Sequence, residues 1–316
     1  MRYAKTVFVV NPQAGNGGTG REWPQIRARA RELLGAFEET LTRGPGDATT
    51  ITRERLKEGA DRIICVGGDG TLNEVINGFF EEDRPLSRQA VLGFLPNGTG
   101  CDFSRTLPIP GGVDASLETI VQNVICAIDL GRVRFQDHGG QNGSRYFHNI
   151  ASAGLGGEVV ERVNRTSKAC GPFLSFIWGM LKSLFFYEGK RVRLCLDGGE
   201  PEDVTILNLA VANGRYHGGG MLVAPDAVID DGLFQVTVIE MMPLPLILWH
   251  LPKLYRGGIE KIRQVSLRTA VRIGAASEQR VLLDVDGEQP GVLPAEWTIL
   301  PGVLRIIAQG PAGKSL

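Results

Sequence analysis

A glycine-rich turn, GGDGT at 67–71, stands between a short apolar run and an amphipathic stretch, and it limits the folds open to the chain. The run Arg62–Val66 is typical of a buried strand, and Thr71–Phe80 has helical spacing. A strand that enters a helix through a glycine turn points backbone N–H groups at an anion, which the helix dipole also favours. A carboxylate beside phosphate repels it unless a metal ion or proton intervenes, so Asp69 indicates magnesium binding or a base. The alternative is a tight turn capped by Asp69.

Two further glycine-rich segments also follow apolar runs. Asn11–Gly20 comes after Thr6–Val10, and Pro96–Asp102 comes after Val91–Leu95. The carboxyl ends of parallel strands meet at one edge of an open α/β sheet, so we expect the three loops to converge on one crevice. No GxxxxGK[ST] sequence occurs, which excludes a Walker A loop.

Strand and helix patterns alternate over the first 130 residues. Apolar residues recur at helical spacing between Ile26 and Phe37, and Phe37–Thr42 is a further strand candidate. This rhythm predicts an α/β domain with an open, mostly parallel sheet and helices on its faces.

After residue 130 short strand candidates replace this rhythm, and turn residues separate many of them. They are Val133–Phe135, Tyr146–Ser152, Arg191–Leu196, Val204–Ala212, Phe234–Glu240, Val265–Ile273 and Val281–Val285. The pattern predicts a mostly antiparallel β-sandwich. Two apolar insertions interrupt it, Pro172–Tyr187 and Pro243–Tyr255. Three prolines within ten residues argue against a regular helix across 243–252.

Composition and charge exclude several protein classes. The net charge is −1, which gives no general attraction to nucleic acid. The five cysteines are odd in number and none forms a CxxC pair, so we expect neither zinc nor a disulfide framework, and a reducing, cytoplasmic location. No run of about 18 apolar residues exists, so we expect no membrane span. The four histidines show no ligand spacing, and no chemistry is assigned to them.

Two acidic clusters lie in the second half. The stretch 224–232 places three carboxylates in a turn before a strand, which fits either a hard-cation site or a solvated turn. The stretch 284–288 reads DVDGE, and strand alternation predicts Asp284 and Asp286 on one face. A strand that ends in Asp-Gly is also an ordinary turn, so these residues alone do not decide between a site and a turn.

Six segments together resemble the diacylglycerol kinase catalytic-domain family, in its bacterial lipid-kinase branch, which is related to the sphingosine kinases. They are NPQAG (11–15), GGDGTLNEVINGF (67–79), PNGTGCDF (96–103), NGRYHGGGMLVAP (213–225), IDDGLF (229–234) and DGE (286–288). The resemblance implies a phosphofructokinase-like nucleotide domain at 1–130, to which 303–316 return, and a β-sandwich lipid-substrate domain at 131–302. ATP as substrate and Mg²⁺ are implied with it.

The resemblance also assigns roles to residues. Nucleotide contacts are expected from Asn11, Thr42, Gly67, Gly68, Asp69, Gly70, Thr71, Asn73, Glu74, Gly98 and Thr99. The metal would bind the Asp231 carboxylate and the backbone carbonyls of Val228 and Leu233. Asp286 would be the general base that takes the proton of the lipid hydroxyl, and Glu288 would support it. Asp69 would organise magnesium and is the rival base.

Two positions depart from the family pattern. Cys101 stands where the family usually has asparagine in the loop 96–102. The loop 11–20 lacks the lysine of many members, and Arg21 is the nearest cation. Both departures affect nucleotide contacts more than the class of reaction.

The implied acceptor is a lipid hydroxyl, most directly that of diacylglycerol or a related glycerolipid. The two apolar insertions, which carry aromatic and basic residues, fit peripheral contact with the inner face of a membrane, or else two core elements of the domain. A homodimer through exposed sandwich strands is a further expectation.

Three alternatives stay open. An NAD kinase also uses GGDGT, although the PNGTGCDF loop and the DGE strand end favour the lipid branch. A nicotinamide-dependent oxidoreductase would use Gly15–Gly20, which satisfies GxGxxG and has Glu38 or Glu39 about 20 residues on. A regulatory module without catalysis is the third, and the retained carboxylates count against it.

Overall fold

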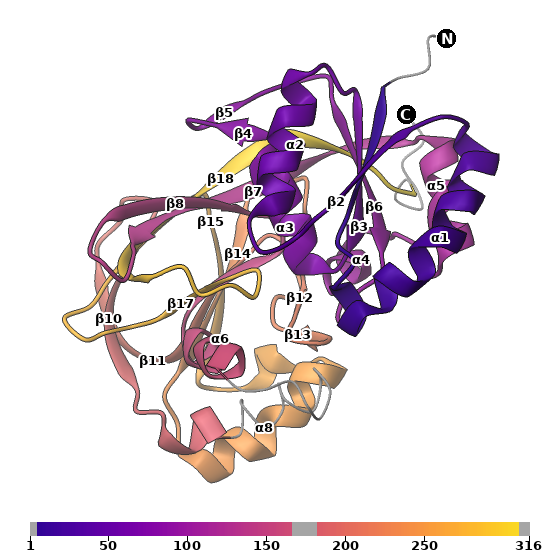
Figure 1. Cartoon of the computed structure of the whole chain (residues 1–316). Coiled ribbons are helices and arrows are strands. Elements are labelled where there is room, and N and C mark those ends of the chain that lie inside the picture. The colour runs from indigo at the N-terminus through magenta and orange to yellow at the C-terminus, as the bar shows by residue number, and fades with distance from the viewer. Residues whose placement is uncertain (1–4, 166–181, 310–316) are drawn as a thin grey trace. The chain divides into compact units, whose positions relative to one another are not determined.

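The computed structural model describes residues 5–165 and 182–309, which form two compact units (Figure 1). The first unit comprises the chain up to Asp129 and again from Pro301, and the second comprises Leu130–Leu300. The sequence placed the boundary near residue 130 and the return near 303. Part of the first apolar insertion, residues 172–181, lies outside the described residues.

The first unit contains a parallel sheet in the order β2-β1-β3-β6, joined at its edge by the end of β18. Its strands are β1 (Thr6–Val10), β2 (Glu38–Leu41), β3 (Arg62–Gly67), β6 (Val91–Pro96) and β18 (Val292–Ile307). Every residue of β1 is buried, as expected of a strand covered on both faces. The parallel sheet predicted from the sequence is confirmed.

Helices cover both faces of this sheet, α1 and α5 on one side and α2 and α3 on the other (Figure 1). The helices are α1 (Ala14–Leu34), α2 (Asp47–Lys57), α3 (Asp69–Gly78), α4 (Phe103–Thr106) and α5 (Val113–Gln122), and the short strands β4 (Phe80–Glu81) and β5 (Arg84–Pro85) form a hairpin. Phe8 and Ile64 pack under α1 against Trp23 and Ile26. Period-2 alternation in the strands thus supplies one apolar set to each helical layer.

The second unit is mostly antiparallel, with strand order β15-β14-β11-β10-β16-β18, while β9 pairs with β11 and β17, and β7 with β8. The strands are β7 (Ile125–Gln136), β8 (Asn142–Phe147), β9 (Ile150–Gly154), β10 (Lys190–Leu196), β11 (Glu202–Ala212), β12 (Tyr216–His217), β13 (Met221–Leu222), β14 (Phe234–Glu240), β15 (Val265–Ala270), β16 (Arg272–Ala276) and β17 (Leu283–Val285). The helices are α6 (Leu155–Arg165), α8 (Leu244–Arg256) and the 3-10 turn η1 (Ile259–Lys261).

Several predicted strands have different bounds. The predicted strand 146–152 is divided between β8 and β9, and 265–273 between β15 and β16, because the chain changes partners there without a glycine or proline to signal it. The long strand β18 was not predicted.

The segment across 243–252 is helical, so the expectation of an irregular segment was wrong. Pro243 lies at the N-cap of α8 and Pro245 in its first turn, where no intrahelical N–H bond is lost. Pro252 is the one proline in the helix interior. The position of prolines within the helix therefore mattered more than their number.

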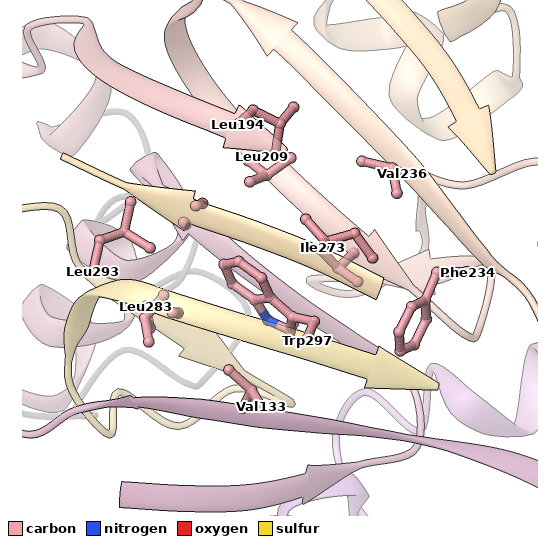
Figure 2. Close-up of a cluster of buried hydrophobic side chains, with 14 of the residues drawn as sticks. Val133, Leu194, Leu209, Phe234, Val236, Ile273, Leu283, Leu293 and Trp297 are labelled. Atoms are coloured by element: carbon pink, nitrogen blue, oxygen red, sulfur yellow. The ribbon is translucent and has the colours of Figure 1, made fainter. Parts of the chain in front are cut away.

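The core of the second unit surrounds Trp297, which is fully buried. Figure 2 shows its indole between strands, with Val133, Leu283 and Ile273 around it. Phe147 and Phe234 stack with ring centroids 5.6 Å apart in the same cluster. This core fixes β17 and β9, the two strands that carry the candidate site. No helix in the described part of the chain is long and apolar enough to cross a membrane.

Candidate active site

The three glycine loops are numbered in chain order: the first is 11–20, the second 67–71 and the third 96–102. The second and third loops are in backbone contact within the first unit. Asn97 N donates to Gly67 O at 2.8 Å, and a Cβ built on Gly98 would lie 2.5 Å from Gly68 Cα. Real carbon atoms do not approach that closely without bonding, so only glycine allows the two loops to pass at this point. The contact explains why position 98 requires glycine.

The first loop joins the other two through side chains. Asn11 Nδ2 donates to Thr71 Oγ1 at 2.9 Å, and Thr19 Oγ1 donates to Asn97 O at 2.8 Å. Gly15 has a positive φ and lies near Asn97 O, so this loop turns before α1 becomes regular. The three loops therefore converge at the carboxyl edge of the sheet, as the sequence indicated.

Asp69 begins α3 and holds the third loop. Its Oδ2 accepts from Asp102 N at 2.8 Å, and its Oδ1 accepts more weakly from Phe103 N at 3.5 Å. Burial, followed by the negative charge of Asp69, raises the pKa of the Cys101 thiol to about 11. Cys101 is therefore a neutral thiol at physiological pH, and it stands in the left-handed region with φ 48°.

The remaining predicted nucleotide residues differ in exposure. Gly70 in the first turn of α3 and Thr99 in the loop after β6 are exposed, whereas Asn73 is fully buried. Thr42 is buried at the end of β2, where its N–H donates to Val10 O. The Glu74 carboxylate accepts from two backbone N–H groups at the start of α2, at 2.9 and 3.1 Å. Glu74 thus caps α2, and direct nucleotide contact by these residues stays a prediction.

In the second unit, Asp286 follows β17 with φ 50° and its carboxylate is buried. Its Oδ1 accepts from Asn149 N at 3.2 Å and Ile150 N at 3.0 Å, and its Oδ2 accepts from His148 N at 2.9 Å. His148 Nδ1 lies 2.7 Å from the same Oδ2. Glu288, two residues on, is exposed. Asp286 thus fixes the turn between β8 and β9.

Asp284, fully buried in β17, has different partners. Its Oδ1 accepts from Gly287 N at 2.8 Å, and its Oδ2 lies 2.8 Å from His217 Nε2. Sequence analysis did not predict this contact because His217 and Asp284 are 67 residues apart. Asp284 and His217 line a cavity whose other walls are almost wholly apolar.

The cavity lies between β9, β11, α6 and α8. Its apolar lining comprises Ile150, Leu155, Val159, Val160, Leu184, Leu207, Ala210, Met221, Val223, Ile239, Ile247, Leu251 and Leu254. Ser152 and Asn208 add the remaining polar groups. An apolar cavity with a few convergent polar groups is typical of a small-molecule site.

The predicted metal residues lie on the exposed loop before β14. Asp231 Oδ1 accepts from Leu233 N at 2.9 Å, and the side chains of Val228 and Leu233 are exposed. One carboxylate with backbone carbonyls fits a hard cation such as Mg²⁺. The described residues contain no group of three or more His, Cys, Asp or Glu side chains that could hold a metal, so a metal here depends on backbone oxygen.

Each half of the chain matches the model of a known protein family. Residues 5–133 match the diacylglycerol kinase catalytic domain. Residues 149–308 match the YegS C-terminal NAD kinase beta sandwich-like domain. The two matches agree with the α/β and sandwich-like units and with the expected fold class.

Individual proteins match over nearly the full length. A diacylglycerol kinase of Staphylococcus saprophyticus is 30% identical over 291 residues, which cover 92% of this chain and 90% of that protein. One from Staphylococcus aureus is 30% identical over 303 residues, covering 95% and 91%. A crystal structure from Bacillus anthracis, assigned as a diacylglycerol kinase, superposes with a TM-score of 0.78 at 26% identity, covering 98% and 97%. The chain therefore belongs to the diacylglycerol kinase family of lipid kinases.

Proposed function

We propose that the protein transfers the γ-phosphate of ATP to the hydroxyl of diacylglycerol or a related glycerolipid. The observation that carries this proposal is the apolar cavity of the second unit, whose polar end is formed by Asp284 and His217 beside the DGE turn. The cavity offers aliphatic walls to acyl chains and polar groups to a hydroxyl. The same chemistry would suit other lipid alcohols, which the assay below distinguishes.

ATP binds the converged loops of the first unit in this proposal. Gly70 in the first turn of α3 is exposed, and the first N–H groups of a helix, together with the helix dipole, suit a phosphate. Asp69 keeps the third loop in place through the N–H groups of Asp102 and Phe103. Since phosphoryl transfer has a loose transition state, positioning and charge neutralisation supply most of the catalysis.

Magnesium is part of the proposal, and Asp231 with the carbonyls of Val228 and Leu233 would hold it. The ion would neutralise charge that develops on the phosphates. In this proposal Asp286 and Glu288 belong to the acceptor side, since the family resemblance implies that Asp286 is the base. The carboxylate of Asp286 already accepts three backbone N–H groups, which supports a positioning role for it.

A membrane surface is the proposed source of the lipid, and α8 supports it. Ile247, Leu251 and Leu254 recur at helical spacing on one side of α8 and line the cavity. Trp249, on another side, is 77% exposed, and Phe186 on the adjoining helical segment 182–186 is 68% exposed. A helix that is apolar on both sides suits a position between a lipid cavity and a bilayer, with Lys and Arg in its last turn attracted to anionic headgroups.

An NAD kinase is the second candidate, because the family description of residues 149–308 names an NAD kinase-like sandwich. The aliphatic walls of the cavity favour acyl chains over a charged dinucleotide. The oxidoreductase alternative finds no support in either family match.

The test offers labelled ATP and Mg²⁺ to diacylglycerol, phosphatidylglycerol, sphingoid bases, undecaprenol and NAD. We expect diacylglycerol, in mixed micelles, to be phosphorylated fastest. Labelling of NAD alone, or of no acceptor, would contradict the proposal. Co-sedimentation with anionic vesicles tests the membrane surface, with Trp249→Ser weakening binding and Val121→Ser, at an exposed apolar position of the other unit, as the matched control. Size-exclusion chromatography with light scattering tests the predicted homodimer.

A further inference from the structure

The cavity of the second unit lies on the outer face of the sandwich sheet, opposite the core. Ala153 of β9 and Leu209 of β11 belong to the core, whereas Ser152 and Ala210, their neighbours in the same strands, line the cavity. Period-2 alternation thus gives each strand one set of side chains for the core and another for the cavity. Residues of α6 and α8 supply the opposite walls. This part of the sheet is therefore covered on both faces.

The floor of the cavity crosses four neighbouring strands. Asp284 on β17 pairs with Ser152 on β9, and Ser152 pairs with Ala210 on β11. The next strand, β14, contributes Ile239, which packs in the same cluster as Ile247 of α8. With about 4.8 Å between neighbouring strands, the floor is about 14 Å long. It therefore leads from a carboxylate at the β17 end to aliphatic side chains at the β14 end.

The two helices approach the sheet to different degrees. At the start of α6, Gly156 N donates to Asn208 Oδ1 at 3.0 Å, and a Cβ built on Gly157 would lie 2.6 Å from the backbone of Leu282. Only glycine allows so close an approach. Helix α8, by contrast, contains no buried residue although three of its side chains line the cavity. The tight contact of α6 and the looser packing of α8 leave the cavity between them.

The size of the cavity fits part of one hydrocarbon chain. Its volume is about 120 Å³. A protein cavity of about 150 Å³ holds one benzene molecule, so this volume corresponds to a segment of about five carbons. Two acyl chains side by side do not fit. The aliphatic walls offer no partner to a charged group, so an uncharged chain is the ligand that they suit.

Ala210 occupies the middle of the floor and is 1% exposed. It lies between Ser152 on β9 and Thr237 on β14 in the strand register. The Thr237 hydroxyl donates to Val223 O at 2.9 Å and does not line the cavity. Apart from Gly156, every other apolar residue among the described lining residues is Val, Leu, Ile or Met. A side chain of that size at position 210 would fill the space above the floor.

We propose that the cavity takes a segment of one acyl chain of the lipid acceptor, and that Ala210 is the specificity-determining residue that keeps the cavity open to this chain. This role rests on the proposed lipid kinase function and names the part of the acceptor that the cavity recognises. The rest of the lipid stays outside the cavity.

The test measures kcat/KM for dibutanoyl-, dihexanoyl- and dioctanoylglycerol, each below its critical micelle concentration, in wild type and Ala210→Leu. In wild type we expect kcat/KM to rise by about fourfold for each buried CH2 group until the cavity is full. Leucine adds three carbon atoms, so the variant should lose about 60-fold on the longest acceptor and show a nearly flat chain-length profile. Its affinity for ATP and Mg²⁺, measured by titration, should match wild type because the nucleotide loops belong to the other unit.

Two further variants separate chain recognition from general damage to the fold. Ala212→Leu is the matched control, because Ala212 is fully buried two residues along the same strand and does not line the cavity. It should keep the rising profile. Ile247→Ala enlarges the cavity from α8, where no residue is buried and folding tolerates the change best. It should extend the rise to didecanoylglycerol.

Titration of wild type and Ala210→Leu with 1-butanol, 1-hexanol and 1-octanol measures chain binding without turnover. A folded Ala210→Leu whose profile matches wild type, or an equally flat profile in Ala212→Leu, overturns the inference while the kinase function stands. If Ala210→Leu does not fold, an Ile247→Ala profile identical to wild type overturns it alone. Wild-type protein that binds alkanols more tightly with chain length but phosphorylates no lipid supports the chain site and contradicts the proposed function.

Discussion

The contact between Gly68 and Gly98 makes a quantitative prediction for Gly98→Ala. The new Cβ would lie 2.5 Å from Gly68 Cα and 3.0 Å from Gly68 N, both backbone atoms that cannot rotate away. Ordinary carbon contacts are about 3.5–4.0 Å, so the two loops must separate by about 1 Å. The Asn97 N to Gly67 O hydrogen bond, now 2.8 Å, would then be too long to persist.

Overpacking of this kind costs about 1–3 kcal/mol, which is about 5- to 150-fold if it appears as lost ATP affinity. Isothermal titration with ATP and Mg²⁺ measures that part, and calorimetric unfolding measures any part that appears as stability. Gly100→Ala is the matched control in the same loop, because its Cβ would meet nothing closer than Asp69 Oδ2 at 3.7 Å. Gly98→Ala with ATP affinity within twofold of wild type and an unchanged unfolding temperature would refute the reasoning, as would an equal loss in Gly100→Ala.

Three further predictions follow from the loops and the DGE turn. Glu74→Ala removes the acceptor for two N–H groups at the start of α2, so we expect about 0.5–2 kcal/mol less stability in urea unfolding, and a stability equal to wild type would contradict the capping role. The rate of alkylation follows the thiolate fraction, and the pKa of Cys101 is about 11 against the ordinary 9.0. Iodoacetamide should therefore modify Cys101 about 100-fold more slowly at pH 8 than an ordinary thiol, which residue-resolved mass spectrometry checks. Asp69→Asn should speed the reaction, because it removes a charge that raises the pKa of Cys101. Asp286→Asn turns an NH2 group toward at least one backbone N–H of 148–150, so we expect about 1–3 kcal/mol lower stability by calorimetry, and an unchanged unfolding temperature would argue against the anchoring role.

The sequence predicted the first unit well because the signals there are local. The run Thr6–Val10 is the observed β1, and the strand predicted at 91–95 is β6 to within one residue. Each glycine loop lies between a strand and a helix of the same unit, so topology alone brings the loops together. The convergence of the loops followed from parallel strand order, whereas the close approach of Gly68 and Gly98 came from the structure.

The second unit was less predictable because its contacts are remote in sequence. The β8–β9 turn at His148 and Asn149 contains no glycine or proline. Its N–H groups are accepted by Asp286, about 137 residues away, and its carbonyls by Asn213, about 65 residues away. His217 was assigned no chemistry since its partner lies 67 residues away. Helix α8 was missed because two of its prolines fall where a helix tolerates them.

Asp284 and Asp286 have different partners because the backbone leaves the strand conformation between them. Strand alternation would place Asp284 and Asp286 on one face, but β17 ends at Val285 and Asp286 adopts φ 50°. The turn directs the Asp286 carboxylate to the N–H groups after β8, while Asp284, still in the strand, reaches His217 at the cavity. Neighbouring carboxylates in different environments commonly divide structural and chemical tasks. Because the strand ends before Asp286, its carboxylate holds the β8–β9 turn while the Asp284 carboxylate contacts His217 on the wall of the cavity.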